Sequence, residues 1–197
     1  MSDFYAFTDK VLKYLRRYMI REFNRAEMQI RTDELNIIPK TVDLYERLYD
    51  EAIKAFLKIA KHKYKECDGT DTIEIAWLMG LLKDANPVTG YIFVNDKDRK
   101  RQYYTESLLS SGDVSKETKK AMRYLYGSFK EYADIVTNEA AMKAYSDTGT
   151  EFVQWNTAKD EHVCGECVPR NEMIYPLQFA PKIPAHYNCR CYYTRVR

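Results

Sequence analysis

The sequence predicts a mainly α-helical protein, with a helical N-terminal body and a small C-terminal β-rich module that zinc stabilises. Three observations support this fold class. Apolar residues recur at helical spacing up to about residue 145, the helical period then stops, and four of the five cysteines follow between residues 164 and 191. A chain of 197 residues is long enough for one core plus a small satellite module. We therefore expect a helical body over residues 1–146 and a Cys/His module over residues 147–197.

The first expected helix runs from Asp3 to about Ile30, because its apolar residues repeat every three or four positions. These residues are Phe4, Phe7, Val11, Leu15 and Tyr18 on one stripe, with Leu12, Met19 and Phe23 beside it. Residues 36–39 interrupt the pattern, and Pro39 is not expected to continue a helix. The second expected helix runs from Thr41 to Cys67, with Gly69 as the stop signal.

The middle of the chain predicts two shorter helices separated by a loop. The first covers about residues 72–83, and the second spans Arg99 to Leu109 and ends at Gly112. Between them, residues 91–95 (YIFVN) are compatible with a short strand or a buried loop.

A long amphipathic helix is expected after Ser115, which has the chemistry of an N-cap residue. Its apolar stripe, typical of a core or helix–helix contact, consists of Met122, Leu125, Phe129, Tyr132 and Val136. The helix should reach about Tyr145, because residues 146–150 (SDTGT) form a boundary.

Three short segments beyond this boundary have the composition of strands. They are residues 151–157, 173–177 and 191–196. The linker is short, so we expect the resulting module to pack on the helical body.

The cysteines of this module follow the pattern C-x2-C-x18-H-x2-C-x-C. The five candidate metal ligands are Cys164, Cys167, His186, Cys189 and Cys191. A module of about 47 residues has too few aliphatic side chains to fold by burial alone, and zinc is the natural staple. The C-x2-C pair can place two thiolates about 2.3 Å from one metal ion, and a second Cys/His pair completes a tetrahedron. We expect one structural zinc ion per chain, because four protein ligands leave no open coordination position.

The ligand set is not decided by spacing alone. We favour Cys164, Cys167, His186 and Cys189, with Cys191 competing for one of the last two places. The alternatives to zinc are two disulfides, which need an oxidising compartment, or free buried thiols. The fifth cysteine, Cys67, lies at a helix end and is expected to be a buried apolar residue.

Composition and charge narrow the classes of function. The net charge is +2, so no global field draws the chain to nucleic acid, and the basic runs at residues 97–101 and 116–120 are expected to be solvated helix faces. The N-terminus lacks the apolar stretch of a signal peptide, and no segment has the length and apolarity of a membrane span. We therefore expect a cytoplasmic chain with reduced thiols and no membrane partner. Seventeen tyrosines fit helix surfaces or, alternatively, an assembly surface.

The C-terminal segments WNTAKDEHVCGEC and PAHYNCRC resemble the motif of the phage head morphogenesis family, the Mu-F-like minor capsid proteins. The family pattern falls on Trp155, Thr157, Asp160, Val163, Cys164, Cys167, His186, Cys189, Arg190 and Cys191. Upstream, Thr137-Asn138-Glu139 stands where family members tend to carry Arg-Thr-Glu, without the arginine. The resemblance covers roughly residues 130–195.

This resemblance implies a minor structural protein of a tailed-phage head rather than an enzyme. Such a protein is assembled in the host cytoplasm, resides in the head or neck region of the virion, and is multimeric in the assembly. Its expected partners are the portal and the major capsid protein, and its expected roles are head assembly and DNA packaging or ejection. The resemblance also implies that Asp160 accepts backbone hydrogen bonds in the metal-binding turn, that Arg190 is a packing or ion-pair residue, and that Trp155 anchors the module.

Two other classes of function compete with this prediction. A zinc-stabilised nucleic-acid-binding module is disfavoured because residues 151–197 hold six Lys or Arg and five Asp or Glu, although a weak contact with packaged DNA could use residues 97–101. A zinc nuclease or a thiol enzyme needs a histidine base, for which His162 is a candidate by proximity alone. A thioredoxin-like redox role does not fit, because no βαβ pattern surrounds the C-x2-C pair.

Overall fold

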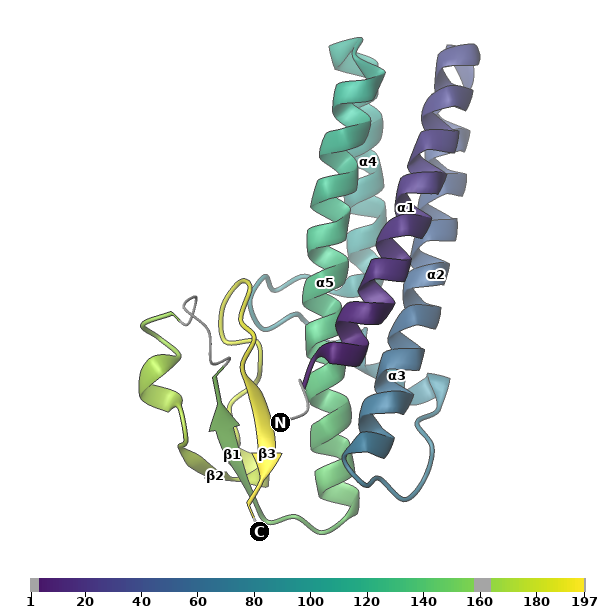
Figure 1. Cartoon of the computed structure of the whole chain (residues 1–197). Helices are drawn as coiled ribbons and strands as arrows, with labels where there is room; N and C mark the ends of the chain where they lie inside the picture. The colour runs from purple at the N-terminus through teal and green to yellow at the C-terminus, as the bar shows by residue number, and fades with distance from the viewer. Residues whose placement is uncertain (1–3, 158–163, 197) are drawn as a thin grey trace.

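The computed structural model of this protein is a helical bundle with a small sheet on its side (Figure 1). It describes residues 4–157 and 164–196. The helices are α1 (Ala6–Thr32), α2 (Ile37–Glu66), α3 (Ile75–Leu81), α4 (Phe93–Ser111) and α5 (Val114–Asp147). The strands are β1 (Phe152–Asn156), β2 (Ile174–Pro176) and β3 (Tyr192–Arg195). The predicted fold class, a helical body followed by a small β-rich module with a cysteine cluster, is confirmed.

The four long helices run side by side with alternating direction, α1 and α4 in one sense and α2 and α5 in the other (Figure 1). Short connections join α1 to α2, through the 3-10 turn Glu34–Asn36, and α4 to α5. The α4–α5 connection turns at Gly112, whose φ of 65° is the left-handed conformation that favours glycine at a helix end. A longer segment that contains α3 links α2 to α4 at the end of the bundle near the sheet.

An aromatic cluster forms the middle of the bundle core. The ring of Phe93 lies 4.8 Å from the rings of both Tyr49 and Tyr132, measured between centroids. Phe129 contacts Tyr49 edge-on at 5.2 Å, and Phe56 lies 5.5 Å from Phe93. Edge-to-face packing of this kind adds to the free energy gained from burying large rings. The long helices are therefore held together by aromatic residues contributed by α2, α4 and α5.

Several helix bounds differ from the sequence prediction, and the largest differences are the starts of α2 and α4. Helix α2 begins at Ile37, so Pro39 lies in its first turn, where a backbone N–H has no acceptor within the helix and its absence costs nothing. Helix α4 begins at Phe93, six residues before the predicted Arg99. The expected strand or loop at residues 91–95 is thus mostly helix, because burying Phe93 in the aromatic cluster extends α4 toward its N-terminus. Helix α3 is shorter than predicted.

The prediction that Ser115 caps the last helix is wrong. Asp113 is the N-cap residue of α5, and its carboxylate accepts a hydrogen bond of 3.0 Å from the backbone N–H of Lys116. The helix ends at Asp147 and the chain turns at Gly149, as the boundary at residues 146–150 predicted.

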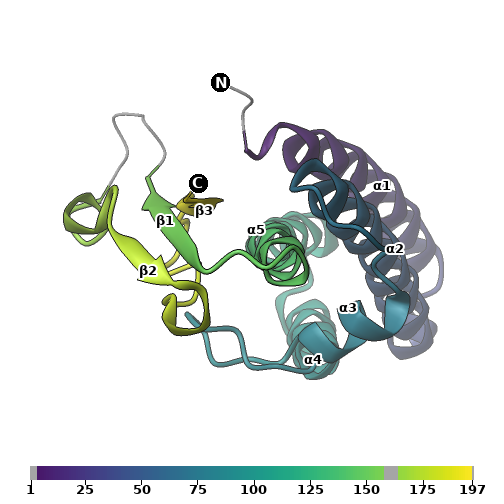
Figure 2. The same ribbon diagram turned by 90° about the horizontal axis from the view of Figure 1, so that it is seen from below.

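The sheet is antiparallel, with strand order β2-β1-β3 and β1 in the centre. All three strands lie within the segments predicted from the sequence. Trp155 on β1 is directly opposite Tyr193 on β3, and both side chains are fully or almost fully buried. Viewed along the bundle, the sheet packs against α5 (Figure 2). Buried residues of the sheet and of the bundle form one continuous core. None of the described helices is long and apolar enough to cross a membrane.

The N-cap assignment predicts a difference between two neighbouring substitutions. Asp113→Ala should lower the free energy of unfolding by about 1 kcal/mol, because the Lys116 N–H loses its acceptor. Ser115→Ala is the matched control, and should change it by less than about 0.5 kcal/mol. Urea denaturation followed by circular dichroism measures both, and equal losses for the two variants would contradict the assignment.

Candidate metal centre

Two hydrogen-bonded turns present the cysteine and histidine side chains of the module. The backbone N–H of Cys167 donates to the Cys164 carbonyl at 3.0 Å, and the N–H of Cys189 donates to the His186 carbonyl at 3.1 Å. Each turn therefore brings two potential ligands that are three residues apart toward one point. Cys191 lies directly before β3, so the sheet fixes its position.

The five predicted ligands lie close together in space. The Nε2 atom of His186 lies 2.9 Å from Cys164 Sγ and 3.0 Å from Cys167 Sγ. The Sγ atoms of Cys167 and Cys189 are 3.9 Å apart. Two groups have all their ligand atoms within 4.8 Å of one another, namely Cys164, Cys167 and His186, and Cys167, Cys189 and Cys191. Cys167 belongs to both groups, so it is the geometric centre of the cluster.

The side chains of this cluster have the chemistry of a metal site. Cys167, Cys189 and Cys191 are buried, Cys164 is half-buried, and all of them are free thiols. The 3.9 Å separation of Cys167 and Cys189 is close to the ~3.8 Å edge of a tetrahedron with metal–sulfur distances of about 2.3 Å. His186 Nδ1 lies 2.9 Å from the Tyr187 carbonyl, to which it can donate its proton, so that Nε2 is left with a free lone pair. The cluster is therefore compatible with bound metal.

The cysteine thiols differ in their electrostatic environment. The pKa of Cys189 is lowered to about 5, because the Cys191 thiol and the backbone N–H groups of Ala185 and Cys191 donate hydrogen bonds to its sulfur. The pKa of Cys191 is raised, because its thiol donates to Cys189 and because it is buried. Burial also raises the pKa of Cys167, to about 12. A cation in the cluster would compensate this burial of thiolates.

The predicted supporting residues occupy different places. Trp155 is fully buried at the centre of the sheet, and the Arg170 guanidinium lies 5.3 Å from its ring. Arg190 pairs with Asp9 of α1 at 3.2 Å and lies 5.3 Å from the ring of Tyr5. Asp160, like His162 and Val163, lies outside the described residues.

Residues of the helical body, which the sequence did not predict to contact the cysteine module, hold the cluster in place. The Tyr5 hydroxyl donates to the Cys191 carbonyl at 2.7 Å and accepts from Asn138 Nδ2 at 2.7 Å. The Phe4 ring stacks on Tyr192 of β3 with centroids 4.5 Å apart. Tyr5 belongs to a segment that the sequence assigns simply to an apolar stripe, so no local pattern distinguishes it. Asn138 lies in the upstream part of the family resemblance, which was the only available signal.

Cys67 is separate from the cluster, at the C-terminal end of α2. Its side chain is largely buried, and its thiol donates to the Tyr145 hydroxyl at 3.6 Å. Burial raises the pKa of Cys67, so this thiol is an inert apolar residue, as the sequence predicted.

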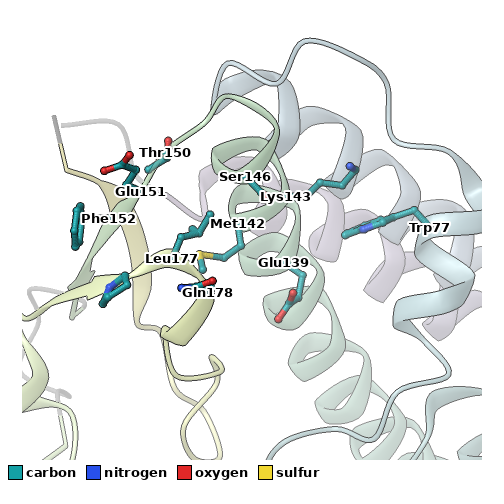
Figure 3. Close-up of a pocket in the computed structure, with 11 residues that line it drawn as sticks. Trp77, Glu139, Met142, Lys143, Ser146, Thr150, Glu151, Phe152, Leu177 and Gln178 are labelled. Atoms are coloured by element: carbon teal, nitrogen blue, oxygen red, sulfur yellow. The ribbon is translucent and has the colours of Figure 1, made fainter.

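A cavity of about 750 Å³ lies between the helical body and the sheet (Figure 3). Trp77 of α3 and Met142 and Lys143 of α5 line one side, while Phe152 and Leu177 line the other. Glu139 lines the same cavity, and burial raises the pKa of its carboxyl group. Since the walls come from α3, α5 and the sheet, a molecule bound here would contact both parts of the chain.

The basic run at residues 97–101 is neutralised by neighbouring carboxylates. Lys97 pairs with Glu46, and both Arg99 and Lys100 pair with Asp96. Arg101 pairs with Asp98 at 3.5 Å. Lys100 is also buried. This run therefore offers little free positive charge to a phosphate backbone.

Comparison of this chain with protein-family models, with curated proteins and with solved structures gives no match. The interpretation of the site therefore depends on its geometry and on the sequence motif.

The cluster geometry predicts that Cys164→Ser removes most of the bound metal. The purified chain should hold about one metal ion, measured by inductively coupled plasma mass spectrometry, and the variant well under half of that, because serine is a poor ligand. The melting temperature should fall in parallel, since metal binding contributes to folding. Cys67→Ser is the matched control and should keep its metal. A Cys164→Ser protein with full metal content and an unchanged melting temperature would contradict the site.

The contact between Tyr5 and the cluster predicts a second effect. Tyr5→Phe should lower the free energy of unfolding of the metal-loaded chain by about 1–2 kcal/mol, because the buried Cys191 carbonyl loses its 2.7 Å hydrogen bond and keeps only the longer one, at 3.5 Å, from Asn138 Nδ2. Tyr14→Phe removes an exposed hydrogen bond to Glu51 and should cost less than about 0.5 kcal/mol. Chemical denaturation of both variants measures the difference. Equal values would show that the Tyr5 hydrogen bond does not hold the module.

Proposed function

We propose that this chain is a minor structural protein of a tailed-phage head, in which a zinc-bound knuckle fixes a small sheet module on the side of an elongated helical bundle. In this proposal the chain associates with the portal or the inner capsid and assists head assembly, DNA packaging or ejection. It acts as a multimeric structural component and not as an enzyme.

The observation that carries the proposal is the convergence of the motif residues. Trp155, Cys167, Cys189 and Cys191 are all buried in the module. Arg190 pairs with α1, and the Cys191 carbonyl accepts a hydrogen bond from the residue directly before α1. Thr157 is buried as well, and both its backbone N–H and its hydroxyl hydrogen-bond to Asn171 Oδ1 at 3.0 Å. The described positions of the motif therefore serve one purpose, which is to close the module and fasten it to the bundle.

Zinc is the metal that this donor set favours. Thiolate and imidazole ligands at tetrahedral spacing suit Zn²⁺. We assign Cys164, Cys167 and His186 as three ligands, from the group that surrounds His186 Nε2. Cys189 is assigned as the fourth, because its sulfur lies one tetrahedral edge from Cys167. In this assignment Cys191 lies next to the site but does not bind the metal.

Exposed apolar side chains support a role in assembly. On the module they gather on β2, on the paired end of β1 and on the flanking turns, and include Phe152, Val168, Met173, Ile174 and Phe179. A second group, Leu35, Ile38 and Leu109, lies at the far end of the bundle, where α1 meets α2 and α4 meets α5. Exposed groups of this kind often mark protein–protein contacts. A chain with apolar surfaces at both ends suits a component that connects two neighbours.

The alternative, a zinc module that binds nucleic acid, has weaker support. The module has nearly balanced charge, and the residue 97–101 run is neutralised by Glu46, Asp96 and Asp98. A DNA-binding zinc module would need a basic surface on the module itself.

Mass spectrometry of purified particles tests the proposal. In cells producing the phage that carries this gene, the chain should copurify with particles at low copy relative to the major capsid protein, and cross-link to portal or capsid subunits. Ile174→Asp places a charge on the exposed apolar surface of the module and should reduce incorporation several-fold. Ile75→Asp, at an exposed position of α3, is the matched control and should be incorporated normally.

A chain found in the cell extract and missing from both particles and assembly intermediates would overturn the proposal. Equal incorporation of the two variants would remove the module surface as the contact.

A further inference from the structure

Helices α1 and α5 lie side by side along the bundle (Figure 1). Their outer surfaces carry a stripe of basic residues. This stripe, the α1/α5 basic face, consists of Lys13, Arg16, Arg17, Lys119, Arg123 and Lys130. All of these side chains are exposed except that of Lys130, which is half-buried. Apart from Lys119, which belongs to the basic run at residues 116–120, no local pattern in the sequence marks this face, because its charges come from residues 13–17 and 119–130, which are more than 100 positions apart.

Helical spacing and contacts between the helices place these residues on one surface. On α5, Lys119, Arg123 and Lys130 follow one another at intervals of four and seven residues, which is one stripe of a helix. Tyr126 belongs to the same stripe, and the Arg16 guanidinium lies 5.4 Å from its ring, across the seam between the helices. On α1, Lys13 and Arg17 lie one turn apart on either side of Arg16.

Among the described residues, the charges of this face form no salt bridge, although Lys130 lies close enough to the buried Asp134 to offset part of the rise that burial causes in the pKa of that carboxyl. The salt bridges formed among the described residues, 4–157 and 164–196, include none of its six members. The nearest acidic residues of α1 are used elsewhere, since Asp9 pairs with Arg190 and Glu27 pairs with Arg31. In this respect the face is the opposite of the 97–101 run. A net charge of +2 therefore conceals a local concentration of free positive charge.

The length of the face matches a stretch of nucleic-acid backbone. Eleven residues separate Lys119 and Lys130, which at 1.5 Å per residue corresponds to about 16 Å along α5. Duplex DNA carries about one phosphate charge per 1.7 Å of its axis when both strands are counted, so a duplex segment of this length carries roughly ten phosphates, of which one side presents a part to the stripe. Six basic side chains are enough for several simultaneous contacts.

We propose that the α1/α5 basic face binds the phosphate backbone of double-stranded DNA, without reading its sequence. The choice of DNA over an acidic protein surface rests on the proposed function, and also on the small number of apolar side chains in the face. The large apolar side chains among these charges are few, namely the half-buried Tyr126 and the exposed Ile20, whereas protein interfaces bury several apolar and aromatic anchors. Long basic side chains with few apolar neighbours suit a phosphate backbone.

The test measures binding of the full metal-loaded chain to a labelled DNA duplex of about 30 base pairs by fluorescence anisotropy, from about 50 to 200 mM salt. The triple variant Arg17→Gln/Lys119→Gln/Arg123→Gln removes three exposed charges of the face. Its affinity should fall roughly tenfold or more, and the slope of log K against log salt should become shallower by roughly 2 to 3. The single variants Arg17→Gln and Arg123→Gln should each reduce the slope by about 1.

The matched control is Lys54→Gln/Lys97→Gln/Arg101→Gln, which loses the same charge from side chains that already have acidic partners. It should bind DNA as the wild type does. Equal binding by the face variants and the wild type would overturn the proposal, and so would an equal loss in the control.

Tighter binding of the wild type to an acidic polypeptide such as polyglutamate than to DNA would also overturn it, in favour of a protein partner. Because binding is measured on the isolated chain, failure here leaves the proposed place of the chain in the particle to be decided by its own experiment.

Discussion

The buried hydrogen bond from the Tyr5 hydroxyl to the Cys191 carbonyl is the contact on which the arrangement of this protein depends. It joins residues 186 positions apart, and it lies between the cysteine cluster, the start of α1 and Asn138 of α5. A buried carbonyl without a donor costs about as much free energy as several surface contacts supply. The Cys191 carbonyl also accepts from Asn138 Nδ2 at 3.5 Å, so it meets both donors where the start of α1 lies against α5. The Arg190–Asp9 pair and the Phe4–Tyr192 stack form at the same place.

Local patterns predicted most of the fold and failed where tertiary contacts decide. The helical period and the SDTGT boundary gave the long helices and the three strands, because amphipathic spacing is a property of neighbouring residues. The sequence did not predict the start of α4, because Phe93 is held in the helix by its contacts with aromatic rings on α2 and α5. Those rings are far from Phe93 in the sequence, so no short sequence segment reveals the contacts. The N-cap was placed at Ser115 instead of Asp113, since both residue types are suitable caps and backbone geometry selects between them.

The candidate site shows the same division. The spacing of the cysteines and His186 predicted that their side chains would meet, and the two turns explain why, since each places two donors three residues apart on one side. The contribution of Tyr5 and Asn138 could not be predicted from spacing, because both belong to apolar or polar helix positions that look ordinary in the sequence. Spacing in the sequence also did not predict which basic residues are free of ion pairs. The conspicuous KDRKR run is paired with carboxylates of α2 and α4, whereas the free charges come from two helices distant in the sequence, and the fold decides which charges are paired.

The sequence pattern changes at residue 147, between the helical body and the cysteine module, but the packing of the chain shows no such boundary. Module residues such as Val153 and Trp155 belong to the same continuous core as the bundle, and the first residues of the chain pack on the last strand. The entropic cost of bringing such distant segments together rises slowly with separation, by only about 0.6 kcal/mol for each doubling of the loop. A few buried contacts therefore offset it. A metal ion that orders the two turns would fix the position of the Cys191 carbonyl. Through the Tyr5 hydrogen bond it would also fix the start of α1, so metal binding in the module would stabilise the bundle directly.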